Sequence, residues 1–477
     1  MLSPLEAGGP ADGGPADPID AAARLAGCRG RVMLHSGRDD DGLGRWSFVA
    51  AEPTATLIAR GRSIVELDAS GKPTRRFTAD PIDTLDAFLR AHDCSLEPRD
   101  GLPEPRVIGY LGYDLAQVIE TLPGGSQIGR DCPDLWLAAY GAIARFASPG
   151  SAGARSVAER RGGGSRGDEM EIVGPDAAAR ARLAARLAAR PVPTLPPSLG
   201  PLIADDDAAH HMARIDKIRD YLAAGDVYQV NLARRHVARI SAPGDLLALY
   251  RALDQAAPAP YGALLEADGV SILSGSPERF LGLVGDRVET RPIKGTAPRS
   301  ATGAADLAAS EKDAAEHLMI VDLERNDLGR IAETGSVTVD DLGYIVELPG
   351  LYHKVSRVSA KLVPGTTHAQ LLRATFPGGS ITGAPKVRAM ELIDELEPVR
   401  RGPYCGALGY FGPGSLELAI AIRIGVVVGN ELRVHVGGGI VADSDPAAEL
   451  AETETKVSGW VAALERLDQL RTRPSRT

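Results

Sequence analysis

The 477-residue sequence is poor in cysteine and has no paired cysteine motif. Its few cysteines lie far apart along the chain, at Cys28, Cys94, Cys132 and Cys405. This spacing argues against a zinc site and against a disulfide framework. A reducing compartment fits such a chain best, so we expect a cytoplasmic protein.

Long apolar runs and an excess of positive charge are also missing. The apolar stretch at 416–428 is too short to span a bilayer and contains Glu417 and Arg423. The start of the sequence has no basic segment followed by an apolar run, so neither secretion nor membrane insertion is expected. The net charge of −10 and the absence of basic clusters with interleaved aromatics argue against a nucleic-acid partner.

The length and the 44% hydrophobic composition allow a large core and suggest two lobes. Residues 1–25 are rich in Gly, Pro, Asp and Ala, which predicts a disordered tail. We expect a first lobe over 26–200, with a flexible excursion at 148–169 where Ser, Gly and Arg show no apolar periodicity. A second, catalytic lobe is expected over 205–470.

Local patterns predict an α+β fold with mostly antiparallel sheets packed together and flanking helices. Short apolar runs at 45–51 and 106–113 are separated by Gly and Pro and indicate strands joined by turns. Residues 175–190 and 211–224 have helical patterns, and Gly225 is placed to end the second of these helices. Regular alternation of strands and helices would indicate a parallel sheet, and the sequence does not show it.

Three acidic residues are candidate metal ligands. Glu449 and Glu452 are three apart in a helical pattern and share a face, and Glu316 lies in another helical run. Carboxylates with room left for water and substrate describe a Mg²⁺ site. The alternative is a solvated helix face on which Glu452 pairs with Lys456.

Two glycine-rich strings, at 376–386 and 437–441, are candidate binding loops. A phosphate loop needs Lys directly after its last Gly, whereas Gly383 is followed by Ala384 and Pro385, so no ATP site is expected. Backbone amides in such strings can hold a carboxylate. Tight turns between elements are the alternative for each string.

Lys294 lies in RPIKGTAPR at 291–299, between stiff or small residues and outside any amphipathic helix. A lysine held this way can act as a nucleophile where burial or a nearby cation lowers its pKa. In isolation an ordinary surface lysine fits the pattern as well.

Taken together, these strings resemble the chorismate-binding family, which includes aminodeoxychorismate, anthranilate, isochorismate and salicylate synthases. The matching segments occur in family order: GDVYQVNLAR at 225–234, SPERF at 276–280, PIKGT at 292–296, EHLMIVDLERNDLGR at 316–330, FPGGSITGAPK at 376–386 and GGGIVADS at 437–444. They cover nearly all of the chain from Asp205 to about Leu467. LHS at 34–36, RWS at 45–47 and GYLGY at 109–113 match more weakly.

The resemblance implies a magnesium enzyme acting on chorismate, a substrate with two carboxylates and a C4 hydroxyl. It implies Glu278 as the general acid that protonates the departing hydroxyl. It also implies His353 as a second catalytic residue near the ring, with polar positioning as the alternative to proton transfer. Mg²⁺ would be held by Glu316 and Glu452 with support from Glu449. The implied substrate-binding residues are Gln229, Thr296, Tyr410, Arg423, Gly438 and Gly439.

Two positions select the nucleophile within the family. Isochorismate and salicylate synthases carry a water-activating lysine where this chain has Gln229. The aminodeoxychorismate enzymes typically have lysine at the position of Lys294, where the anthranilate enzymes have a small residue. The resemblance therefore implies addition of ammonia through a covalent Lys294 intermediate, in 4-aminobenzoate and folate synthesis, with anthranilate formation as the alternative.

The resemblance also implies partners. No cysteine lies in the glycine-rich setting of a glutaminase nucleophile, so ammonia is expected from a separate glutamine amidotransferase subunit. In the first lobe, Leu34, Ser36, Arg45, Trp46 and Ser47 resemble the family's tryptophan pocket.

Overall fold

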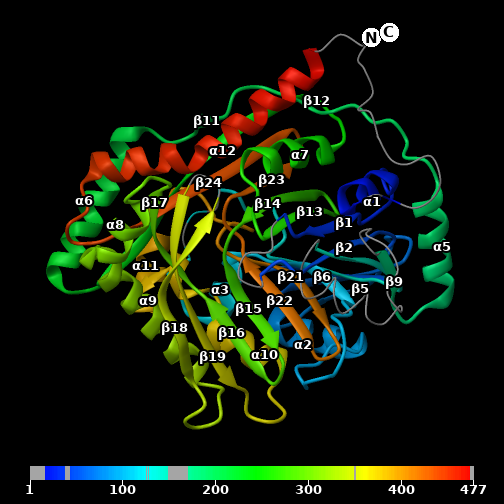
Figure 1. Ribbon diagram of the computed structural model, residues 1–477, viewed down its shortest axis with the longest axis horizontal. Coiled ribbons are helices and arrows are strands. Elements are labelled where there is room, and N and C mark those ends of the chain that lie inside the picture. The colour runs from blue at the N-terminus through cyan, green and yellow to red at the C-terminus, as the bar shows by residue number, and fades with distance from the viewer. Residues whose placement is uncertain are drawn as a thin grey trace.

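The structure, a computed structural model, is built around two large β-sheets with helices on their outer sides (Figure 1). It describes residues 15, 17–37, 43–124, 126, 128–148, 170–348 and 351–472. Each sheet has twelve strands, and neighbouring strands are antiparallel. The α+β, mainly antiparallel architecture expected from the sequence is confirmed.

The first sheet carries the second glycine-rich string at one of its strands. Its order is β10 (Ser198–Leu199), β12 (Gln229–Ala242), β24 (Glu431–Ile440), β23 (Ile424–Val428), β14 (Val270–Ser276), β13 (Tyr261–Ala267), β1 (Val32–His35), β2 (Trp46–Ala50), β8 (Ile143–Ala147) and β9 (Met170–Val173). β11 (Ile203–Ala204) and β20 (Gly383–Ala384) also pair with β12.

The second sheet carries Lys294 on an edge strand. Its order is β17 (Ile293–Pro298), β19 (Leu351–Lys361), β16 (Arg287–Arg291), β15 (Arg279–Val284), β22 (Ser415–Ile420), β21 (Ala407–Gly412), β6 (Val107–Leu111), β7 (Leu135–Ala139), β3 (Ala55–Arg60), β4 (Ser63–Asp68) and β5 (Pro73–Thr78). β18 (Thr338–Leu348) pairs with β19.

Both sheets combine strands from the two ends of the chain. β1 pairs with β13, so that Leu34 lies opposite Ala263, and β6 pairs with β21, so that Gly109 lies opposite Gly409. The segments 26–200 and 205–470 therefore share both sheets. The division near residue 200 is a division of the sequence and does not separate the sheets.

The helices cover the outer faces and the ends of the sheets (Figure 1). They are α1 (Pro18–Arg24), α2 (Pro81–Ala91), α3 (Ala116–Ile119), α5 (Ala177–Ala188), α6 (Ala208–Ala224), α7 (Leu246–Ala256), α8 (Gly303–Ala309), α9 (Glu311–Gly329), α10 (His368–Thr375), α11 (Lys386–Leu396) and α12 (Pro446–Thr472), with 3₁₀ turns η1 (Tyr113–Leu115) and η2 (Gly379–Ile381). Within the described ranges, no helix is long and apolar enough to cross a membrane.

Local signals place several helix ends. α6 stops at Gly225, which takes φ of 80° as its C-cap, and α9 starts at Ser310, whose side chain accepts the amide of Asp313. A left-handed C-cap favours glycine because a Cβ would be strained there. The helices expected at 175–190 and 211–224 are confirmed as α5 and α6.

The start of the chain corrects one expectation. Part of the tail predicted over 1–25 is α1, which has Asp17 as its N-cap and Pro18 in its first turn. Ala21, Ala22 and Leu25 are buried against the first sheet and α7, so this stretch has apolar surface to bury despite its composition. Residues 1–14 and 16, and the excursion expected over 148–169 beyond Ser148, lie outside the described residues.

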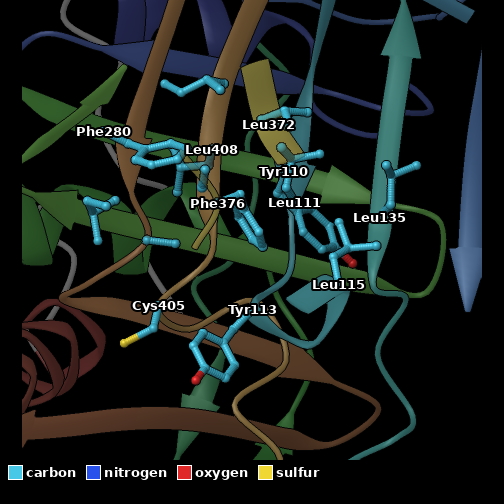
Figure 2. Packing of buried hydrophobic residues seen from close by; sticks show 14 of the residues in the cluster. Tyr110, Leu111, Tyr113, Leu115, Leu135, Phe280, Leu372, Phe376, Cys405 and Leu408 are labelled. Carbon is cyan, nitrogen blue, oxygen red and sulfur yellow. The ribbon is translucent and has the colours of Figure 1, made fainter. Parts of the chain in front are cut away.

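A continuous apolar core joins strands of both sheets to α10 and positions the segments around the site. Figure 2 shows Phe280 of β15 and Phe376 after α10 close to Leu408 of β21. The rings of Phe280 and Phe376 meet edge to face, with their centroids 6.0 Å apart. Phe280 follows Glu278 by two residues, and Phe376 opens the first glycine-rich string, so this contact fixes both segments relative to each other.

Candidate active site

Glu278 lies in the short link between β14 and β15 and is only 5% exposed. Its backbone is held at both ends: its N–H donates to Ser276 Oγ at 3.3 Å, and its carbonyl accepts the Ile420 N–H at 3.0 Å. Burial raises the pKa of the carboxyl, and the Ser380 hydroxyl and the Lys294 ammonium partly oppose this. The protonated form is therefore favoured, as a proton donor requires.

Lys294 lies on β17 and is partly buried. Burial lowers the pKa of its ammonium; the nearby Glu278 carboxylate opposes this shift, and the Lys456 ammonium adds to it. Glu316 and Glu452 also act on this amine electrostatically. The structure thus brings the candidate nucleophile together with the candidate acid and two candidate metal ligands. A lowered pKa favours the neutral, nucleophilic amine.

His353 lies on β19 opposite Thr296 of β17, and only 3% of it is exposed. Its Nδ1 is 2.9 Å from Thr296 Oγ1, while its Nε2 has no hydrogen-bond partner among the described residues. Burial, with a contribution from the Arg423 guanidinium, lowers the pKa of His353 to about 4. The imidazole is neutral near pH 7, so it suits hydrogen bonding to a ligand better than proton transfer.

Arg423 precedes β23 with a φ of 51°, an uncommon conformation for a non-glycine residue. The side chain is partly buried, which lowers the pKa of its guanidinium, and the Glu278 carboxylate opposes this shift. Its electrostatic effect on both Glu278 and His353 places it at the same site. A planar guanidinium there can bind a carboxylate.

Gln229 and the glycines of β24 form the wall on the first sheet. A Cβ built on Gly439 would lie 1.9 Å from Gln229 Nε2, so only glycine permits this contact. Gln229 is 2% exposed, and its Oε1 has no hydrogen-bond partner in the described part of the chain. A Cβ on Gly438 would lie 3.2 Å from Glu449 Oε2 and 3.6 Å from Glu452 Oε1. Gly438 thus lets the side chains of α12 approach β24, while Gly439 makes room for Gln229.

The candidate metal ligands fit Mg²⁺ by their chemistry, since all three would offer carboxylate oxygens. Two of them flank Gly438, and Glu316 acts with Glu452 on Lys294. At present Glu452 Oε1 pairs with Lys456 Nζ at 2.6 Å, and Glu449 Oε1 accepts from Ser444 Oγ at 2.6 Å. Among the described residues no three acidic, histidine or cysteine side chains are gathered closely enough to hold an ion. The Glu452–Lys456 ion pair, which the sequence offered as the alternative to a metal site, therefore forms in the structure.

Comparison with known proteins decides the family. The family described as "chorismate binding enzyme" matches residues 33–461. The chain belongs to this family. Within the chorismate-binding family, it is 39% identical to aminodeoxychorismate synthase component 1 of Klebsiella aerogenes, over 91% of this chain and 93% of that protein. It is 34% identical to anthranilate synthase component 1 of Pseudomonas aeruginosa, over 95% and 94%.

A solved chorismate-binding structure shares the architecture. The crystal structure of anthranilate synthase component I from Streptococcus pneumoniae superposes with a TM-score of 0.71 at 28% identity, covering 87% of this chain and 92% of that one. Together with the family match and the 39% identity to aminodeoxychorismate synthase component 1 over 91% of the chain, this makes the chain a chorismate-binding enzyme of the aminodeoxychorismate synthase type.

Tyr410 is the one predicted substrate-binding residue that the structure places elsewhere. Its ring lines a cavity of about 560 Å³ and meets the Phe48 ring edge to face at 5.0 Å. Neither Glu278, Lys294 nor Arg423 lines that cavity. The structure thus places Tyr410 beside this cavity and apart from the other candidate residues, and its binding of the substrate carboxylate stays a prediction.

The same cavity contains most of the predicted tryptophan pocket. Leu34, Arg45 and Trp46 line it, and the Arg145 guanidinium lies 5.3 Å from the centre of the Trp46 ring. Ser36 and Ser47 do not line the cavity but bond to each other, with the Ser36 N–H donating to Ser47 Oγ at 2.9 Å. The five residues therefore form one local unit at the junction of β1 and β2.

Ser380 is a site residue that sequence reasoning missed. It lies in η2, within the first glycine-rich string, and is 6% exposed. Its hydroxyl lowers the pKa of Glu278, yet Ser380 Oγ has no well-aligned hydrogen-bond partner among the described residues. The hydroxyl is thus available to a ligand beside the candidate acid. The sequence signal for Ser380 was the glycine-rich string at 376–386, in which only the glycines were interpreted as binding elements.

Proposed function

We propose that this chain is the chorismate-aminating subunit of an aminodeoxychorismate synthase, converting chorismate and ammonia to 4-amino-4-deoxychorismate for 4-aminobenzoate and folate synthesis. The observation that supports it best is the pairing of Lys294, whose pKa is lowered, with Glu278, whose pKa is raised. One group is ready to attack and the other to give up a proton.

The proposed reaction has two displacements. Lys294 Nζ attacks ring carbon 2, the ring double bonds shift, and the C4 hydroxyl leaves as water with the proton from Glu278. Ammonia then attacks carbon 4, the double bonds shift back, and the bond from carbon 2 to Lys294 breaks. The lysine nitrogen keeps both its protons as a secondary ammonium on carbon 2 and leaves as the neutral amine, and the proton lost by ammonia restores Glu278. Nitrogen therefore ends at carbon 4, para to the ring carboxylate.

The remaining side chains position the substrate. The Arg423 guanidinium suits a carboxylate, and the neutral His353 ring, held by Thr296 at 2.9 Å, suits a hydrogen bond near the ring. Gln229 and the glycines of β24 leave room for the ring where a water-activating lysine would otherwise stand.

Mg²⁺ is part of the proposal. Glu316 and Glu452, with Glu449 in support, would hold it, and its charge would stabilise the ring carboxylate. To take part, Glu452 would exchange its pairing with Lys456 for the ion. Removal of Mg²⁺ with a chelator should abolish turnover, and readdition should restore it; full activity in the chelator would contradict this role.

Two ligands complete the proposal. Ammonia would come from a glutamine amidotransferase subunit, and free ammonium at alkaline pH should replace that subunit. An isolated chain that stays inactive in concentrated ammonium with Mg²⁺ would contradict this. Tryptophan would occupy the cavity beside Trp46, and calorimetric titration with tryptophan that produces no heat of binding would refute this assignment.

The decisive test is the identity of the product. Purified protein is incubated with chorismate, Mg²⁺ and ammonium, and the product is identified by chromatography and mass spectrometry beside Lys294→Ala. We expect 4-amino-4-deoxychorismate from the wild type, and slow turnover or the carbon-2 product from the variant. Anthranilate from the wild type would contradict the proposal and assign the chain to the alternative.

A further inference from the structure

A buried carboxylate on α9 holds the turn that contains Ser380. Glu324 is 4% exposed, and its Oε1 accepts the Gly379 N–H at 2.9 Å. The approach is close, because a Cβ built on Gly379 would lie 2.7 Å from Leu323 Cδ2 and 3.1 Å from Glu324 Oε1. Glycine at 379 lets the turn lie directly on the helix, and Glu324 anchors it there.

The opposite side of the turn faces the candidate acid. A Cβ built on Gly378 would lie 2.8 Å from Ile420 Cδ1 and 3.5 Å from Phe280 Cδ2, so the turn fits tightly against β22 and β15. Phe280 in turn contacts Phe376 (Figure 2). Glu278 directly precedes β15, and the hydroxyl of Ser380 acts on it. η2 is thus packed between the carboxylate of Glu324 and the carboxyl of Glu278.

A second contact holds the ends of the glycine-rich string. Lys386 forms an ion pair with Asp327, which lies on the same face of α9 as Glu324. Lys386 Nζ also donates to Pro377 O at 2.9 Å and to Thr375 O at 3.2 Å. This pair fixes the two ends of the string. In the middle, Arg401 donates to Ile381 O at 2.9 Å, and Glu324 is the group that accepts the Gly379 N–H.

A carboxylate is a costly choice for this position. Burial and the neighbouring Asp327 raise the pKa of Glu324 to about 7, so part of its hydrogen-bonding strength is lost to protonation near neutral pH. An apolar side chain would fill the same space without this cost, but it could not accept the Gly379 amide. The contact to that amide is therefore the property that explains a glutamate here.

We propose that Glu324 is a positioning residue: by accepting the Gly379 N–H it fixes η2 so that the Ser380 hydroxyl stays beside Glu278 during proton donation to the leaving hydroxyl. This rests on the proposed function only in the role of Glu278 as proton donor. The positioning role of Glu324 is the same whether nitrogen is added at carbon 4 or at carbon 2.

The test compares two variants of matched length. Glu324→Gln keeps an oxygen that can accept the amide, whereas Glu324→Met lacks an acceptor, and both remove the charge. With saturating ammonium, we expect Glu324→Met to lower kcat about tenfold with little change in KM for chorismate, because a displaced turn affects the transition state more than binding. Glu324→Gln should recover most of that loss.

A double-mutant cycle with Ser380→Ala separates positioning from general support of the fold. If Glu324 acts through Ser380, adding Glu324→Met to Ser380→Ala should cost nothing further in kcat. The alkaline limb of the pH profile should also lie at higher pH in Glu324→Met than in Glu324→Gln, since loss of the Ser380 hydroxyl raises the pKa of Glu278. Thermal unfolding of every variant is measured alongside, and Glu324→Ala replaces Glu324→Met if the latter does not unfold cooperatively.

Three outcomes would overturn the proposal: additive losses in the double mutant, equal kcat values for the Gln and Met variants, or a loss confined to KM. Failure of the proposed function is distinguishable from each of these. It would appear as anthranilate from the wild type, and the cycle could then be measured on anthranilate formation.

Discussion

At the scale of single residues, the site depends on two groups whose pKa values are shifted toward each other. The proposed reaction needs Lys294 neutral and Glu278 protonated. Burial lowers the first pKa and raises the second, so both conditions hold together in a larger fraction of molecules than they would for free side chains. His353, with a pKa of about 4, is neutral near pH 7.

The expected pH–rate profile is a bell. As pH falls through the pKa of Lys294, the amine gains a proton and stops attacking. As pH rises through the pKa of Glu278, the acid loses the proton it must donate. The profile of kcat/KM for chorismate is measured with the concentration of neutral ammonia held constant, because ammonia itself titrates.

Lys294→Ala provides the control for this profile. Its residual activity should keep the alkaline limb and lose the acid limb. An acid limb that persists unchanged in the variant would show that another group sets it and would remove Lys294 from the mechanism.

Tyr410 and Ser380 show what the sequence could predict at this scale. The motifs predicted that Glu278, Lys294, His353 and Arg423 act at one place, and the structure brings them together. Which face a strand residue presents depends on register, so the motif around Tyr410 could not show that its ring points to the other cavity. Ser380 reaches the site because its turn packs between elements that are distant in the sequence, and no local sequence pattern predicts that packing.

At the scale of elements, two glycines let β24 approach its neighbours closely: Gly438 lies against the carboxylates of α12, and Gly439 lies against Gln229 of β12. Gly439→Ala would drive a Cβ into Gln229 Nε2, at 1.9 Å, so Gln229 or the strand must move. We expect a loss of about 1 to 3 kcal/mol in the free energy of unfolding, as for other overpacked sites. KM for chorismate should rise at the same time, since Gln229 is a proposed substrate-binding residue.

Gly200→Ala is the matched control for this prediction. Its nearest atom outside the neighbouring residues would be Arg239 O at 3.8 Å, an ordinary contact. Chemical denaturation and chorismate kinetics are compared for the two variants. Equal stability and equal KM in both would show that the close contact between Gly439 and Gln229 does not constrain the site.

Helices were the elements that the sequence predicted best. α5 and α6 appear where their patterns and the C-cap at Gly225 place them, because their signals are local. α1 was missed because its few apolar residues are small and lie in a segment of tail-like composition. It is ordered by contacts with the first sheet and α7, which only the folded chain provides.

At the scale of the whole molecule, neither half of the chain can complete a sheet alone. β1 and β2 of the first sheet depend on β13, and β6 of the second depends on β21. We therefore expect residues 1–200 and 201–477, produced separately, to lack a cooperative unfolding transition. The intact chain should unfold with near-ultraviolet and far-ultraviolet circular dichroism changing together.

Co-expression of the two segments is the control. Because the cut at residue 200 falls between β10 and β11 and interrupts neither strand, the segments should assemble and recover activity. A folded, stable 201–477 segment on its own would contradict this expectation. The sequence could not reveal the shared sheets, since pairing between strands that lie more than two hundred residues apart leaves no periodicity in either strand.

The pairing of β6 with β21 also affects how the protein is made. On the ribosome, Val107–Leu111 is synthesised long before Ala407–Gly412, so one edge of the nascent second sheet stays open for most of translation. All five residues of β6 are buried in the finished protein, and such a strand is prone to pair with other chains while it waits. Holding chaperones should therefore bind this protein during synthesis and leave it only when the last strands have emerged.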